Sequence, residues 1–124
     1  MLDDEETVLK FVSRALGPQG FVVHTTSDPQ GALELLEANS PALLFCDYHM
    51  PTMTGQEFYR CVVDAHPSMR DRFVFLSGDV TGEEIHSFLL ATGTVAVSKP
   101  IGVKELRELV AIRLGELGAM PGVG

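Results

Sequence analysis

The stretch of sequence that decides the fold is Ala42-Leu43-Leu44-Phe45-Cys46-Asp47, an apolar run closed by a single carboxylate. Such a run is typical of a strand that is covered on both faces, as the strands of parallel sheets are. A second run of this kind, Phe73-Val74-Phe75-Leu76-Ser77, stops at a small hydroxyl residue. Two apolar strands that each end in a polar side chain predict a buried parallel sheet with functional groups along one edge.

Helical and strand patterns alternate along the rest of the chain, with turn signals between them. Apolar residues at helical spacing predict a first helix that ends at Gly17-Pro18, and Asp28-Pro29 predicts the capped start of a second. The order helix-strand repeats to the end, so we expect a parallel sheet with helices on both faces. The further predicted helices lie near residues 58–65, 85–92 and 106–114, and the further predicted strands at residues 21–25 and 94–98.

The length and composition indicate one globular domain, which we place at residues 1–117, followed by a flexible tail at 118–124. The chain has 17 acidic and 9 basic residues and a formal charge of −8. A general nucleic-acid binder would need a basic face, so we expect no direct contact with nucleic acid. No apolar run approaches the roughly 20 residues of a membrane span, and the acidic start differs from a signal peptide. We therefore expect a cytoplasmic protein.

Polar side chains gather at the predicted strand ends. Asp47 and Ser77 end two strands, Lys99 follows the last one, and Asp3 and Asp4 precede the first helix. Functional groups of open α/β sheets collect beyond the carboxyl ends of the strands, so we expect these five side chains to meet.

The chemistry of this set points to phosphoryl transfer. Clustered carboxylates repel one another and favour a divalent cation such as Mg²⁺, which prefers oxygen ligands. A carboxylate can also attack phosphorus, and Mg²⁺, an ammonium and a hydroxyl can each stabilise the transferred group. Asp47 is the candidate phosphoacceptor, Asp3 and Asp4 are metal ligands, and Ser77 and Lys99 contact the phosphoryl group.

The sequence resembles the response regulator receiver family of two-component signalling over residues 2–114. Each motif alone is weak, but the four motifs together, in this order, are specific. The resemblance rests on Leu2-Asp3-Asp4-Glu5, on Leu43-Leu44-Phe45-Cys46-Asp47 with Met50-Pro51 and Thr54-Gly55, on Phe75-Leu76-Ser77-Gly78, and on Ser98-Lys99-Pro100.

The resemblance implies a doubly wound, flavodoxin-like parallel sheet and a phosphoryl donor that is a phosphohistidine of a sensor histidine kinase or phosphotransfer protein. It also implies a cis peptide bond at Lys99-Pro100. The backbone carbonyl of His49 would join Asp3, Asp4 and Asp47 around Mg²⁺. Phosphorylation would draw the Ser77 hydroxyl inward and switch protein contacts. Such a domain is no enzyme in the ordinary sense, since it catalyses only its own phosphorylation and dephosphorylation.

Two features depart from the family. Only Met1 and Leu2 precede the acidic pair, so the first strand, which is normally central, is largely missing. Its loss would leave a gap on the order of 10 Å between residues 21–25 and 42–47. Either the natural chain extends upstream, or a homodimer or strand-swapped assembly fills the gap. In addition, Ala96 stands where the family often has an aromatic switch residue.

Three other interpretations remain open. The first is an Mg²⁺-dependent phosphatase with an aspartate nucleophile, although such enzymes commonly have a second Asp where this chain has His49. The second is a degenerate receiver that serves only as an interaction scaffold, which the short start and Ala96 suggest. The third concerns context, since the domain could act alone or be the receiver of a hybrid sensor kinase.

Overall fold

A parallel sheet forms the centre of the molecule in the computed structural model, which describes residues 1–78 and 80–117. Within this part of the chain the strand order is β1-β2-β3, all parallel. Asp47 pairs with Leu76, and Ser77 pairs with Ser98, so the carboxyl ends of the strands are level. The strands are β1 (Leu44–Asp47), β2 (Phe73–Ser77) and β3 (Val95–Ser98).

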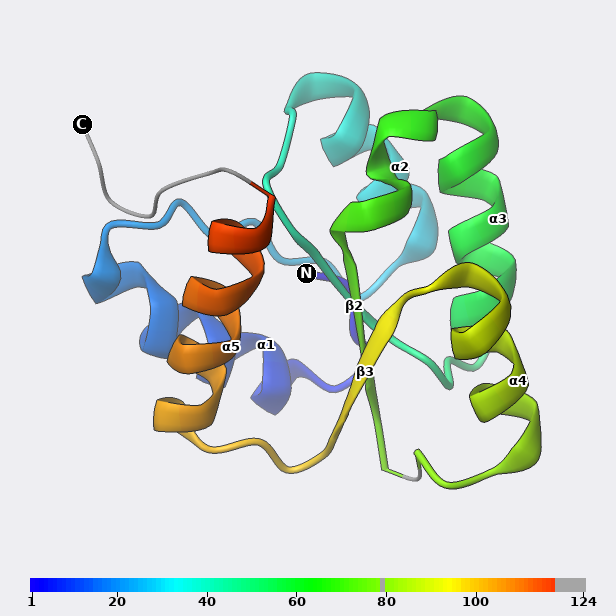
Figure 1. Ribbon diagram of the computed structural model, residues 1–124. Helices are drawn as coiled ribbons and strands as arrows, with labels where there is room; N and C mark the ends of the chain where they lie inside the picture. Colours follow the sequence, from blue (N-terminus) through cyan, green and yellow to red (C-terminus); the bar gives the residue numbers. More distant parts are fainter. Residues whose placement is uncertain (79, 118–124) are drawn as a thin grey trace.

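Helices cover the sheet from both sides. One pair lies together on one side in Figure 1, and the other three helices lie on the opposite side. This arrangement confirms the predicted doubly wound α/β fold. The pair is α1 (Glu6–Leu16) and α5 (Val103–Glu116), the other three are α2 (Pro29–Ala38), α3 (Gly55–Ala65) and α4 (Glu83–Thr92), and two short 3-10 helices are η1 (Gly17–Gln19) and η2 (Pro67–Arg72).

The core has two parts, because successive side chains of a strand point to opposite faces of the sheet. Phe45 and Val74 pack with α1 and α5 in one apolar cluster. Cys46 and Phe75, their neighbours along the strands, pack with α2, α3 and α4 in the other. All residues of β1 and β2 are buried, which is why their sequences are almost continuously apolar.

Local signals fix the ends of several helices where the sequence predicted them. Pro29 is the first residue of α2, and the Asp28 carboxylate accepts a hydrogen bond from the Gly31 N–H at 3.3 Å. The helix α4 ends at Gly93, whose φ of 69° lies in the left-handed region that glycine adopts without strain.

The strand predicted at residues 21–25 does not form, and this prediction was wrong. Residues 21–25 contain no strand, and only Thr26 makes an isolated parallel bridge, to Leu2. A strand needs a neighbour to bond with, and little chain is available beside these residues. Val22 is accordingly 84% exposed.

The first residues partly replace the missing strand, whose absence was predicted correctly. Leu2 bridges both Thr26 and Cys46 in parallel. The Leu2 N–H donates to the Phe45 carbonyl at 2.8 Å, and the Asp47 N–H donates to the Leu2 carbonyl at 2.9 Å. The expected gap is therefore closed at the carboxyl end of the sheet.

Two other predictions concern the end of the chain and membrane-spanning helices. The flexible tail predicted at residues 118–124 lies outside the described residues. Across residues 1–78 and 80–117, no helix combines the length and the apolar character that crossing a membrane would require.

Replacing Phe75 by alanine should lower the free energy of unfolding by about 3–5 kcal/mol, because the ring is fully buried and its loss leaves a cavity. The ring contacts those of Tyr48, Tyr59, Phe73 and Phe88. Urea unfolding followed by circular dichroism measures the loss. The control is Val22→Ala on the exposed segment, which should change stability by less than about 0.5 kcal/mol. Equal losses in the two variants would contradict the described core.

Candidate functional site

The candidate site lies at the carboxyl edge of the sheet, where β1 and β3 end. Asp47 is the last residue of β1 and is only 4% exposed. Lys99 directly follows β3 and is held there by its N–H, which donates to the Ser77 carbonyl at 2.8 Å. The Lys99-Pro100 peptide bond is cis, as the sequence predicted. Backbone pairing in the sheet thus places both residues at the same edge.

Asp3 is carried to this edge by the short N-terminal segment. Its N–H donates to the Thr26 carbonyl at 3.2 Å, and its side chain is completely buried. The Oδ1 atom of Asp3 accepts a hydrogen bond from the Glu5 N–H at 2.8 Å, at the turn into α1. The pairing of Leu2 with both sides of the gap therefore decides where the acidic residues lie.

The Lys99 ammonium lies among the carboxylates. Its Nζ atom is 2.8 Å from Asp3 Oδ2, 3.1 Å from Glu5 Oε1 and 3.4 Å from Asp47 Oδ1. Together with Asp4, these three acidic residues each offer an oxygen atom, and the four oxygens lie within 4.8 Å of one another. The structure thus brings together four of the predicted site residues, Asp3, Asp4, Asp47 and Lys99.

Glu5 belongs to this cluster although the sequence interpretation assigned it no role. Its side chain is exposed by 56% and still reaches Lys99. The available signal was the acidic run that starts at Asp3 and ends at Glu6, directly before the first helix. Which members of such a run face the site depends on the path of the chain, so the run alone could not single out Glu5.

The electrostatics of the site are dominated by negative charge. Burial raises the pKa of Asp47 to about 7, and a hydrogen bond with Asp4 and the charge of Asp3 act in the same direction. Burial lowers the pKa of Lys99, but the hydrogen bonds with Asp3 and Glu5 outweigh it and leave the pKa above its ordinary value. Lys99 therefore stays charged, whereas Asp47 is present in both its protonated and its ionised form near neutral pH.

The four carboxylates fit a hard divalent cation. All four offered atoms are oxygens, which Mg²⁺ prefers. Asp3 Oδ2 is buried and makes no hydrogen bond of regular geometry, and the Lys99 ammonium at 2.8 Å is its charged contact. One ammonium cannot neutralise four carboxylates, so the cluster retains a net negative charge that a cation would offset.

His49 and Ser77 lie beside the cluster. The His49 N–H donates to Asp47 Oδ1 at 3.4 Å, which places His49 directly beside Asp47. Ser77 is fully buried and follows Leu76, the residue that pairs with Asp47.

A cavity of about 570 Å³ opens over the site and is lined by Asp4, Glu5, Asp47, His49, Leu76, Gly78, Lys99 and Pro100, among others.

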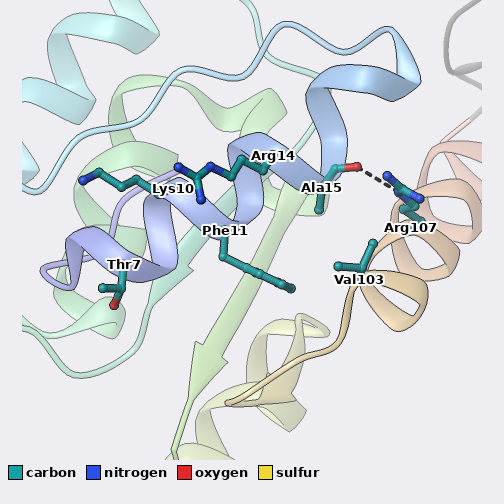
Figure 2. A pocket seen from close by; sticks show the side chains of 7 residues that line it. All are labelled: Thr7, Lys10, Phe11, Arg14, Ala15, Val103 and Arg107. Atoms are coloured by element: carbon teal, nitrogen blue, oxygen red, sulfur yellow. Dashed lines mark hydrogen bonds between the residues drawn. The ribbon is translucent and has the colours of Figure 1, made fainter.

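A second cavity, of about 370 Å³, lies between α1 and α5 and adjoins the first, because Thr7 and Phe11 line both. We call it the α1–α5 groove (Figure 2). Its basic residues are Lys10, Arg14 and Arg107, and the Arg107 Nε–H donates to the Ala15 carbonyl at 2.9 Å. Three of the 9 basic residues of the chain thus line one groove.

The sequence matches the family "Response regulator receiver domain" over residues 1–111, which is most of the chain. The protein therefore belongs to the response regulator receiver domain family, and so to two-component signalling.

Known relatives agree with this membership. The chain is 36% identical over 111 residues to the cyclic di-GMP phosphodiesterase response regulator RpfG of Xanthomonas campestris, covering 86% of this chain but 29% of that protein. The fold is similar to that of a CheY-like receiver domain protein from Methanospirillum hungatei, with a TM-score of 0.83, 23% identity and coverage of 94% and 92% of the two chains. Chemotaxis protein CheY4 of Vibrio cholerae gives a TM-score of 0.81, with 25% identity and coverage of 91% and 94%. The chain thus spans under a third of the curated relative and nearly all of the solved domains.

The raised pKa of Asp47 predicts how stability should depend on pH in metal-free buffer. In the unfolded chain the carboxyl group ionises near its ordinary pKa of 3.8, whereas in the folded protein it holds its proton up to about 7. The folded state therefore binds more protons between these values, and this contribution to stability is lost as pH rises from about 4 to about 7.

Asp47→Asn removes that loss, so the variant should be more stable than the wild type at pH 7.5 by about 1–2 kcal/mol and nearly equal to it at pH 4.5. Urea unfolding at both pH values with EDTA present measures the difference. Asp64→Asn on α3 serves as the control and should show no such change with pH. A stability difference between Asp47→Asn and wild type that is the same at both pH values would contradict the assignment.

Proposed function

We propose that this domain accepts a phosphoryl group on Asp47 from the phosphohistidine of a sensor histidine kinase or phosphotransfer protein. The observation that carries the proposal is a buried carboxylate at a strand end, in contact with a lysine ammonium and surrounded by further carboxylates. Family membership supports it, since receiver domains act in two-component signalling.

In the proposed reaction, an Asp47 carboxylate oxygen attacks phosphorus, the bond from phosphorus to the donor imidazole nitrogen breaks, and an acyl phosphate forms. Lys99, whose ammonium is 3.4 Å from Asp47 Oδ1, would pair with the added negative charge. The buried Ser77 would contact a phosphoryl oxygen through its hydroxyl group. Asp47 must be ionised to attack, which its raised pKa opposes at rest.

Mg²⁺ is the cofactor we propose, held by Asp3, Asp4 and Asp47 with the backbone carbonyl of His49. The oxygen donors of the acidic cluster and its excess negative charge support this choice. When bound, the ion would supply positive charge to the transferring group. Its charge would also favour the ionised form of Asp47, since the carboxylates that repel one another would share a cation.

Two alternatives fit the site less well. A phosphatase with an aspartate nucleophile would need an acid or base close to the leaving group, and His49 offers an imidazole where such enzymes commonly have an Asp. A scaffold without chemistry would have no need to keep Asp3 and Asp47 buried around Lys99, because burying charge is costly. The intact cluster therefore favours the phosphoacceptor.

Phosphorylation is proposed to switch protein contacts, but without an aromatic switch at position 96. Ala96 lies in β3 and packs, partly buried, against the cluster that contains Phe75 and Phe88. A methyl group cannot swing between an inward and an outward position as a ring can. Any change that starts at Ser77 would therefore pass through the backbone of β2 and β3.

The α1–α5 groove is the part of the surface that we propose receives the donor protein. It adjoins the cavity over Asp47, and its lining residues include the apolar Phe11 and Val103 and the basic Lys10, Arg14 and Arg107 (Figure 2). A helix with apolar residues flanked by acidic ones would complement this groove in shape and charge. The basic residues of the groove would also direct such an acidic helix to this part of a domain whose net charge is −8.

The acceptor role is tested with acetyl phosphate and Mg²⁺, by following the mass of the intact protein. The wild type should gain one phosphoryl group, and Asp47→Asn should gain none. Lys99→Met should gain the group at least about tenfold more slowly, because removing a charge that stabilises the transition state costs several kcal/mol. Asp64→Asn is the control and should behave as the wild type. Unchanged labelling of Asp47→Asn would refute the acceptor, and steady release of phosphate from phosphomonoesters would favour the phosphatase.

The groove is tested by reversing the charge of Arg14. A sensor kinase that phosphorylates the wild type, found by screening the kinases of the source organism, should phosphorylate Arg14→Glu about tenfold more slowly at low salt. Arg60→Glu on α3 makes the same change in net charge away from the groove and should have little effect. Acetyl phosphate should label all three proteins equally. If Arg14→Glu and Arg60→Glu lower the rate of phosphorylation by the kinase equally, the groove has no special part in docking.

A further inference from the structure

Glu5 makes two contacts that join the start of α1 to Lys99. Its backbone N–H donates to Asp3 Oδ1 at 2.8 Å, and its Oε1 atom accepts a hydrogen bond from the Lys99 ammonium at 3.1 Å. The other oxygen of Asp3, Oδ2, lies 2.8 Å from the same ammonium. Asp3, Glu5 and Lys99 thus form a closed ring of contacts in which Glu5 takes part twice.

The side chain of Glu5 does not stabilise the helix that it begins. Glu5 is the N-cap residue of α1, and none of the first-turn N–H groups, all of them in the described part of the chain, donates to its side chain. Ser, Thr, Asp and Asn are favoured at this position, because their shorter side chains bond to those N–H groups. The helices α2 and α3 follow this preference and are capped by Asp28 and Thr54. The Glu5 carboxylate contacts Lys99 instead.

The Lys99 ammonium lies closer to Asp3 and Glu5 than to the acceptor. The distances from Nζ are 2.8 Å to Asp3, 3.1 Å to Glu5 and 3.4 Å to Asp47. Attraction between charges weakens with distance, so the two carboxylates of the N-terminal segment hold the ammonium more strongly than Asp47 does. A group held by three carboxylates at once has little freedom to follow new charge that arises at one of them.

Lys99 would have to move when Asp47 carries a phosphoryl group. Glu5, Asp47 and Lys99 all line the cavity of about 570 Å³ over the site, and the phosphoryl oxygens would enter this cavity. To meet them, the ammonium must leave one of its present partners. Glu5 is the partner that it leaves most easily, because the Glu5 side chain is 56% exposed whereas that of Asp3 is completely buried.

We propose that Glu5 is a positioning residue that holds the Lys99 ammonium beside Asp3 and delays its approach to the phosphoryl group on Asp47. This inference rests on the proposed function, which makes the phosphoryl group a later partner of Lys99. No covalent bond forms or breaks in this step, since the ammonium exchanges a hydrogen bond to Glu5 for one to a phosphoryl oxygen. Glu5 thus acts on the reaction through Lys99.

The charge of Glu5 offers a competing explanation. A carboxylate beside the cavity would repel an incoming dianion whether or not it contacts Lys99. Glu5→Asp separates the two effects, because it keeps the charge and shortens the side chain by one methylene group. The shorter carboxylate suits the N-cap position and would accept from N–H groups of the first turn, out of reach of Lys99.

The test compares the full chain with its Glu5→Asp variant. With acetyl phosphate and Mg²⁺, Glu5→Asp should gain the phosphoryl group about two- to fivefold faster, the size expected from losing a partly exposed ion pair. In a Lys99→Met background the same change should have no effect on the rate, because Glu5 then has no lysine to hold. Glu5→Ala, which removes both the contact and the charge, should be labelled at least as fast as Glu5→Asp.

NMR of the metal-free protein provides a second measurement. The signal of the Lys99 Nζ atom, assigned by its absence from Lys99→Met, should shift in Glu5→Asp and in Glu5→Ala. A role of Glu5 in the helix alone would leave this signal unchanged. Glu6→Asp makes the same substitution one residue further along and is the control, which should alter neither the labelling rate nor the Lys99 signal.

Three results would overturn the inference. Glu5→Asp, folded as judged by circular dichroism, could be labelled no faster than the wild type. It could speed labelling equally in the Lys99→Met background, which would assign the effect to charge or to helix capping. The Lys99 signal could stay in place in both Glu5 variants. Failure of the proposed function looks different, because the wild type would then gain no phosphoryl group, and the shift of the Lys99 signal alone would decide whether Glu5 positions the lysine.

Discussion

The buried ion pair between Lys99 and Asp3, with 2.8 Å between Nζ and Oδ2, is the interaction on which the rest of the site depends. It joins the start of the chain to the residue that follows the last strand. Burying two charges is costly, and the pair is tolerated because Glu5 and Asp47 also contact the ammonium. Without Lys99, four carboxylate oxygens within 4.8 Å would face one another with no fixed positive charge between them. The lysine therefore holds together a cluster whose members would otherwise repel.

Two regular features of parallel sheets position this cluster and support it. Level strand ends put Asp47, Ser77 and Lys99 at one edge. Side chains of β1 and β2 point alternately to the two faces of the sheet and pack in both apolar clusters. The two strands that end at this edge are therefore held by core packing on both faces. The least supported part is the N-terminal segment, which contributes Asp3 and Asp4 from a stretch in which Leu2 makes the parallel bridges. The precision of the acidic cluster thus depends on the least supported part of the sheet.

Local signals made most of the fold predictable from the sequence. Asp28-Pro29 and Gly93 mark helix ends by their own conformational preferences, and the run that ends in Asp47 could only be a buried strand. The strand expected at residues 21–25 failed because a strand is stable only beside a partner, and pattern alone shows no partner. The burial of Asp3 and the contact of Glu5 with Lys99 depend on the pairing of Leu2, which no local pattern contains. The α1–α5 groove was missed because its cations come from two helices far apart in the sequence, which the bond between Arg107 and Ala15, 92 residues apart, joins.

The proton that Asp47 holds near neutral pH has a consequence for background signalling. A protonated carboxyl group is a poor nucleophile, so under the proposed function only the ionised part of the Asp47 population would react with small acyl phosphates that enter the cavity. Positive charge at the neighbouring carboxylates would enlarge this ionised part. The site would then respond most strongly when a cation and a donor are present together, and stray phosphodonors alone would react less.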